Sequence, residues 1–166
     1  MARQIGEYAM KRSIFALSLV AFLAACGTPE AATAQVDKLE VKQVVIRLAP
    51  VQGRPSAGYF TLHGGKTADR LTAVSSPKAT KIELHESRME GGVMRMRPLT
   101  GVEIPAGGSV VFKPGGNHAM LFGVDPSVKP GSVMPLRFVF GSGSSIDAQA
   151  KVIGVGDDMP MNHDGH

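Results

Sequence analysis

The sequence predicts an all-β fold, a two-sheet sandwich or Greek-key barrel built from about ten short strands. From residue 39 onward, short apolar-rich runs alternate with glycine and proline, which is the pattern of strands separated by tight turns. No stretch keeps a sustained helical period, and no segment repeats. The 166 residues are enough for one domain with peripheral segments and too few for a second full domain.

The first 25 residues have the features of an export signal. Lys11 and Arg12 precede the apolar run 14–23, which is too short to span a bilayer. Small residues flank Cys26, in the sequence LAACG, which resembles a bacterial lipobox. We therefore expect a lipoprotein signal over 1–25 and a lipid on Cys26. The alternative is cleavage after residues 32–34, with Cys26 an ordinary apolar residue of the discarded signal.

A lipid anchor would place the protein in the periplasm, attached to the bacterial envelope. Gly27 weakly favours the outer membrane, because aspartate after the cysteine is the usual retention signal in enteric-type sorting. Residues 26–38 are mainly small and polar and are expected to form a tether. The formal charge of +4 falls to +2 over residues 26–166, so we expect no nucleic-acid partner.

The folded domain is expected over residues 39–154. Turn residues such as the glycine pairs at 64–65 and 91–92 separate its apolar runs. The expected strands are 39–48, 57–63, 70–75, 81–87, 93–97, 101–104, 109–113, 118–124, 133–140 and 146–154. The core candidates are Phe60, Leu62, Leu71, Val74, Ile82, Leu84, Val111, Leu121, Leu136, Phe138 and Phe140. Leu71 and Val74 cannot both face inward in a regular strand, because side chains alternate between its two faces.

Histidine and methionine concentrate in two short stretches, 84–96 and 116–120. Side chains two residues apart in a strand share a face, so His118 and Met120 can grip one ion together. Residues 90–92 are expected to form a hairpin turn that brings the strand of His85 beside the strand of Met96. A methionine in a β core is usually apolar filling, but this coincidence favours a metal site made by His85, Met96, His118 and Met120.

Imidazole and thioether donors without a thiolate suit a soft monovalent ion, which points to Cu(I). Structural zinc sites would use cysteines, and a blue-copper centre needs a cysteine thiolate. Cys26 is the only cysteine and stands at the lipid position. Holding and handing over copper is therefore favoured over electron transfer.

Further candidates for copper contact rank below these four. Met89 and Met94 could be substitute ligands, outer cover or core. Residues 155–166 are expected to form a flexible tail, either merely solubilising or able to catch copper through Met159, Met161, His163 and His166. His63 is expected to lie solvated at a strand end.

The intervals between His85, Met96, His118 and Met120 all match the motif of periplasmic PCuAC-type copper chaperones, which the sequence resembles over about 39–154. Flanking stretches such as 82–86, 92–97, 105–108 and 113–118 agree with that family. Ser87 stands where the family often has methionine, and His63 lies near a usual asparagine.

This resemblance implies a cupredoxin-like β-sandwich that binds one Cu(I). It implies delivery to the CuA centre of cytochrome c oxidase subunit II, often alongside thioredoxin-like Sco proteins. Separately, we expect the carrier to be a monomer. It also implies that a tail rich in histidine and methionine binds additional copper, including Cu(II).

Two other functions stay open. The chain could buffer copper at the envelope without a dedicated recipient, or it could be a metal-free structural lipoprotein with its methionines in the core. Catalysis is not expected, because the sequence has no nucleophile elbow, no phosphate-binding or dinucleotide-binding glycine pattern, and no carboxylate pair suited to acid–base chemistry.

Overall fold

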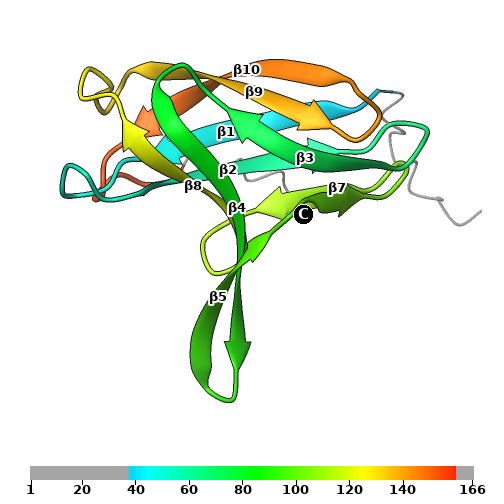
Figure 1. The fold of residues 1–166 in the computed structure, drawn as a ribbon, viewed down its shortest axis with the longest axis horizontal. Coiled ribbons are helices and arrows are strands. Elements are labelled where there is room, and N and C mark those ends of the chain that lie inside the picture. The colour runs from blue at the N-terminus through cyan, green and yellow to red at the C-terminus, as the bar shows by residue number, and fades with distance from the viewer. Residues whose placement is uncertain (1–37, 160–166) are drawn as a thin grey trace, which may run out of the picture. The chain divides into compact units, whose positions relative to one another are not determined.

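The computed structural model describes residues 38–159, which form a unit of ten β-strands (Figure 1). None of these residues is helical, and so no described segment is a helix able to cross a membrane. The predicted all-β class is confirmed. The strands are β1 (Glu40–Arg47), β2 (Ser56–His63), β3 (Asp69–Ser75), β4 (Ala79–Glu90), β5 (Val93–Leu99), β6 (Val102–Ile104), β7 (Ser109–Phe112), β8 (Asn117–Val124), β9 (Val133–Phe140) and β10 (Ser145–Ile153).

Hydrogen bonding joins all ten strands into one mixed sheet in the order β5-β4-β8-β7-β2-β1-β10-β9-β3-β6. β8 also pairs with β2, and β1 pairs with β10 in parallel. The sheet curls so that its two halves face each other across the core. Phe60 of β2 stacks on Phe112 at 4.1 Å and meets the edge of Phe138 from β9 at 4.9 Å between ring centroids. Aromatic packing thus joins the two halves as in a sandwich.

The predicted core is largely correct. Phe60, Leu62, Leu121 and Phe138 are almost completely buried, whereas Val111 is 49% exposed and its prediction was wrong. In β7 the residue that pairs with Phe60 is Phe112, so Phe112 faces inward and its neighbour Val111 must face outward.

Leu71 and Val74 are both buried although they stand three residues apart in β3. The pairing of β3 with β9 shifts register between Leu71 and Ala73. A β-bulge adds one residue to a strand and so reverses the alternation of its faces. The bulge explains how both side chains reach the core.

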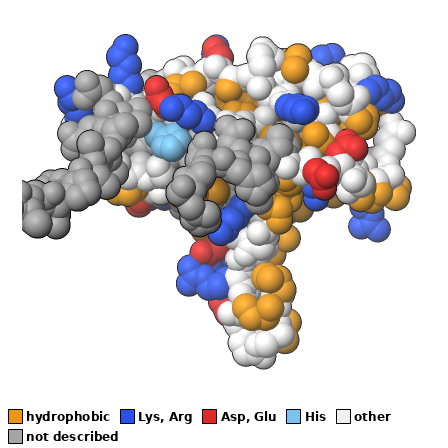
Figure 2. Space-filling model, turned by 180° about the vertical axis from the view of Figure 1, so that it is seen from behind, with side chains coloured by type: hydrophobic (Ala, Val, Ile, Leu, Met, Phe, Trp, Pro, Cys, Tyr) orange, Lys and Arg blue, Asp and Glu red, His pale blue; other side chains and the backbone are white. Residues whose placement is uncertain are grey.

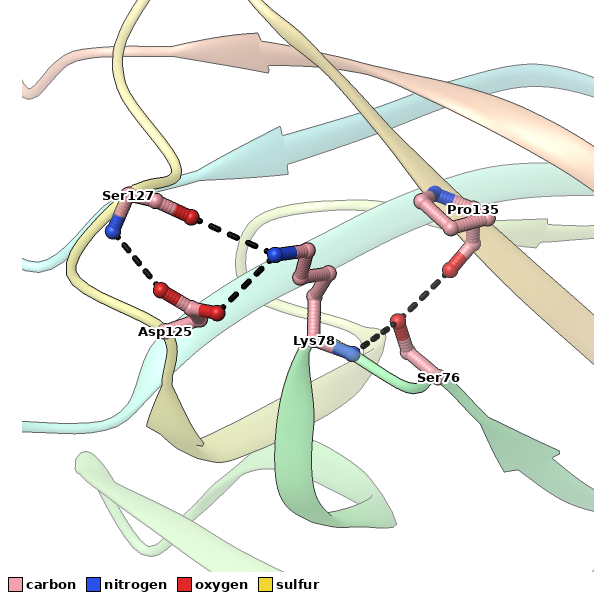
Figure 3. A network of polar contacts seen from close by, with 5 residues as sticks. All are labelled: Ser76, Lys78, Asp125, Ser127 and Pro135. Carbon is pink, nitrogen blue, oxygen red and sulfur yellow. Dashed lines mark hydrogen bonds and ion pairs between the residues drawn. The ribbon is translucent and has the colours of Figure 1, made fainter.

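A polar network connects the start of β4 to the end of β8 (Figure 3). Lys78, just before β4, forms an ion pair with Asp125 at 2.9 Å and a hydrogen bond with the Ser127 hydroxyl, while its backbone amide donates to Ser76. Hydrogen bonds from Ser127 and Lys78 lower the pKa of Asp125 to about 2. The network holds together the ends of two strands that carry the predicted ligands.

Candidate metal centre

The hairpin of β4 and β5 turns at Gly91 and Gly92. Their φ angles are 59° and 81°, and Glu90 pairs with Val93 on either side of them. A two-residue hairpin turn of this kind needs positive φ at both central positions, which glycine adopts without strain. The predicted turn at 90–92 and the predicted pairing of the two strands are confirmed. Met96 consequently lies opposite Ser87, two residues along β4 from His85.

His85 and His118 stand directly opposite each other on the paired strands β4 and β8. Their ring centroids are 5.9 Å apart, and the ring planes are inclined by 33°. The adjacent pair, Leu84 and Ala119, is buried in the core, so both histidines lie on the other face of the sheet. Two imidazoles that are distant in sequence are therefore held side by side by backbone pairing.

The four predicted ligands share one face of the three strands. Met120 pairs with Glu83 and Met96 pairs with Ser87, so each methionine is a diagonal neighbour of His85, on opposite sides of it. Diagonal neighbours in a sheet lie about 7–8 Å apart. Met120 is partly buried, and Met96 is 54% exposed on the hairpin. The structure thus brings the two histidines together and places one thioether on each side of them.

The hydrogen bonds of His118 determine which ring nitrogen is free. Nδ1 lies 2.9 Å from the carbonyl oxygen of Gly116, and a carbonyl can only accept, so Nδ1 carries the proton and donates. Nε2 then keeps an unprotonated lone pair. A histidine that ligates a metal usually donates from its other nitrogen in this way.

In His85 the other ring nitrogen is hydrogen-bonded, and Nδ1 is free. Its Nε2 lies 2.9 Å from Oε2 of Glu83 and donates to that carboxylate. Its Nδ1 is enclosed and has no hydrogen-bond partner among the residues that the structure describes. A buried polar atom without a partner is rare in folded proteins, and a metal ion would provide one. The site therefore presents Nδ1 of His85 and Nε2 of His118.

Glu83 is a site residue that sequence reasoning missed. Lys81 forms an ion pair with it and, together with the hydrogen bond from His85, lowers the pKa of its carboxyl group. The carboxylate thus stays ionised and fixes the ring of His85. The signal was present in the sequence, because Glu83 precedes His85 by two residues and so shares its face.

Among residues 38–159, no group of three or more histidine, cysteine, aspartate and glutamate side chains is arranged to hold a metal ion. The donors gathered on the face of His85 and His118 are instead imidazole nitrogens and thioether sulfurs. The oxygen donors on that face of the three strands are the carboxylate of Glu83, which is bonded to Lys81 and His85, and the hydroxyl of Ser87 opposite Met96.

The lower-ranked candidates are distributed differently. Met89 and Met94 pair with each other near the hairpin turn and are 60% and 52% exposed. Met159 is partly buried beyond the last strand. His63 ends β2, partly buried, with its Nδ1 2.8 Å from the Ser109 hydroxyl. The remaining predicted residues lie outside the described part of the chain: Cys26, Met161, His163 and His166.

Comparison with known families gives two matches. Residues 39–152 match the family described as "Putative lipoprotein LpqE-like". Residues 10–26 match the lipid attachment site of prokaryotic membrane lipoproteins, which ends at Cys26 and supports a lipid-anchored envelope protein. A relative in Leifsonia xyli subsp. xyli, named "Putative lipoprotein Lxx21020", is 30% identical over 112 residues, or 67% of each chain.

Solved structures of two copper-bound proteins have a similar fold. The copper-bound PCuAC domain from PmoF2 is 21% identical with a TM-score of 0.59, over 72% of this chain and 95% of that domain. Cu(I)-bound DR1885 from Deinococcus radiodurans is 25% identical with a TM-score of 0.56, over 76% of this chain and 85% of its own. The predicted cupredoxin-like β fold and the predicted resemblance to PCuAC-type proteins are confirmed.

The hydrogen bonds of the two histidines predict opposite tautomers in the metal-free protein. Long-range ¹H–¹⁵N spectra should show His118 protonated at Nδ1 and His85 protonated at Nε2. Glu83→Gln should release His85 to sample both tautomers while His118 stays unchanged, because His85 is hydrogen-bonded to Glu83 and His118 to the carbonyl of Gly116. Identical tautomers for both rings in the unsubstituted chain would contradict the arrangement.

Proposed function

Because the chain belongs to the LpqE-like lipoprotein family and has the fold of PCuAC domains, we propose that it is an envelope copper carrier that binds one Cu(I) through His85, Met96, His118 and Met120. The observation that carries the proposal is the pair of facing imidazoles, each with one hydrogen-bonded nitrogen and one free nitrogen. Nothing in the core needs that arrangement, because both rings lie on the outer face of the sheet.

The donor set supports Cu(I) over harder ions. Imidazole and thioether are neutral, and thioether sulfur is a soft ligand that favours Cu(I). The solved structures of similar fold include a copper-bound PCuAC domain and a Cu(I)-bound protein. A thiolate for a blue-copper centre is not provided, since the single cysteine stands at the lipid attachment site.

His118 is buried and the side chain of His85 is 12% exposed, but the exposure of Met96 on the hairpin side supports transfer rather than permanent storage. Met96 is 54% exposed, so a ligand of a partner protein can approach the ion from the hairpin side. Ligand exchange of this kind moves Cu(I) without a change of oxidation state and requires no catalytic group. The proposed role is therefore that of a non-enzymatic carrier.

The proposed location is the periplasmic face of the envelope, with a slight preference for the outer membrane. In this arrangement residues 1–25 are the signal, 26–38 the tether, 39–154 the copper domain and 155–166 a tail that binds further copper, including Cu(II). The proposed recipient is the CuA centre of cytochrome c oxidase, reached directly or with a Sco-type protein. The resemblance to PCuAC-type chaperones supports that recipient.

Cu(I) competition against a strong chromophoric chelator tests the site. The purified chain should take up one tightly held Cu(I), and His118→Ala/Met120→Ala should weaken that binding by more than about 100-fold, since loss of even one outer-shell partner of a metal typically costs 10–100-fold. The matched control is His63→Ala/Met134→Leu, which also removes one imidazole and one thioether but leaves this face intact. Equal binding by the parent and the His118→Ala/Met120→Ala variant would favour the metal-free structural lipoprotein.

Deletion of the gene tests the recipient, in a host that assembles a CuA-containing oxidase. We expect the CuA signal and oxidase activity to fall at ordinary copper supply, and to be restored by the wild-type gene but not by the His118→Ala/Met120→Ala gene. Copper tolerance should change little. Impaired tolerance with normal oxidase would instead indicate the buffering role.

A further inference from the structure

The outer part of the β4–β5 hairpin projects beyond its neighbours (Figure 1). Pairing of β4 with β8 ends at Glu86, whereas pairing with β5 continues to Glu90. The amide of Ser87 still donates to the carbonyl oxygen of Gly116, and from Arg88 to Arg95 the two strands are paired only with each other. This segment adds nothing to the core, so the choice of its side chains is not dictated by packing.

Methionines gather on one face of this projecting segment. Six of the nine methionines fall within the described residues, and four of these lie on the face of His85 and His118. Three of the four, at positions 89, 94 and 96, are 60%, 52% and 54% exposed. Exposed large apolar side chains are normal when scattered singly, but three thioethers on one face of one hairpin are a local concentration.

Met89 and Met94 are a directly opposed cross-strand pair. Opposed residues in an antiparallel pair have Cβ atoms about 4.5–5.5 Å apart. Methionine is unbranched with three rotatable bonds, so the two sulfurs can converge on one ion without movement of the backbone. Met96 follows Met94 on the same face, about 7 Å further along the strand toward His85.

Charged side chains of the hairpin lie on the opposite face (Figure 2). On that face Arg88 forms an ion pair with Glu86 at 2.6 Å, and Arg95 forms an ion pair with Glu90 at 3.5 Å. The alternation of strand residues leaves Ser87 and the three methionines on the other face. The methionine face thus offers sulfur donors to a soft cation, while the positive charges point away from it and are partly neutralised.

We propose that Met89 and Met94 form a second, weaker Cu(I) site at the tip of the hairpin, from which the ion passes by way of Met96 to His85 and His118. This inference deepens the proposed function, because it names the route by which the copper of that same carrier arrives and leaves. Each step exchanges a thioether for another thioether or an imidazole on Cu(I). No electron or proton moves, and the charge of the complex is unchanged.

The test is a titration of the full chain, in detergent micelles, with Cu(I) kept reduced, against a strong and then a weak chromophoric chelator. Methionine methyl groups labelled with ¹³C report which sulfurs are bound. Met89→Leu/Met94→Leu removes both tip thioethers with little change of volume. Val93→Leu is the matched control, since Val93 is an exposed apolar residue of the same hairpin without sulfur.

In the unsubstituted chain we expect one equivalent of Cu(I) that resists the strong chelator and a second that competes only with the weak one. Any Cu(I) bound by the tail is counted apart from these two, because it shifts the methyl signals of Met159 and Met161. The second equivalent should shift the methyl signals of Met89 and Met94. Met89→Leu/Met94→Leu should lose the second equivalent and keep the first, and Val93→Leu should keep both. Retention of the second equivalent by the double leucine variant, or unshifted methyl signals at 89 and 94, would overturn the inference.

The variant His118→Ala/Met120→Ala separates this inference from the proposed function. If the main site is correct, that variant loses the tight equivalent and keeps the weak one. If the unsubstituted chain shows only a weak equivalent and the double leucine variant removes it, the tip site stands and the proposed function fails.

Discussion

The register of three strands, β5, β4 and β8, is the constraint on which the candidate site depends. Because side chains alternate along each strand, a slip of one residue between β4 and β8 would send one of the two histidines to the core face. Leu84, Ala119 and Leu121 oppose such a slip, since their burial would be lost with it. The hydrophobic core therefore sets the positions of polar donors that it does not contact.

Once the strand register has placed the two histidines, hydrogen bonding decides which of their ring nitrogens are left to bind a metal. Glu83 accepts a hydrogen bond from Nε2 of His85, and the carbonyl of Gly116 accepts one from Nδ1 of His118. The two free nitrogens are therefore different atoms of the ring, Nδ1 of His85 and Nε2 of His118, on rings whose centroids are 5.9 Å apart. Met120 on β8 and the exposed Met96 on β5 flank them, so an ion can be bound from the sheet and approached from the hairpin.

Much of this could be predicted from the sequence, because the relevant signals are local. Gly91 and Gly92 predict the hairpin, and the spacing of His118 and Met120 predicts a shared face. The wrong core prediction depended on contacts between distant segments. Val111 and Phe112 are both apolar, and only pairing with Phe60 decides which one faces inward. The bulge after Leu71 depends on the pairing of β3 with β9, which sequence spacing does not identify. The spacing of Glu83 and His85 does place them on one face, but it does not show that the two side chains are hydrogen-bonded. Equally, nothing in the spacing shows that the two methionines flank His85 on opposite sides.

The central claim is that one Cu(I) binds between the two histidines with sulfur in its coordination shell. X-ray absorption at the copper K-edge, on the chain carrying one Cu(I), tests this directly. The account predicts a Cu(I) edge, imidazole scattering from two rings and at least one sulfur neighbour, with the imidazole contribution reduced in His118→Ala/Met120→Ala. A spectrum without imidazole scattering, or one unchanged by that substitution, would contradict it.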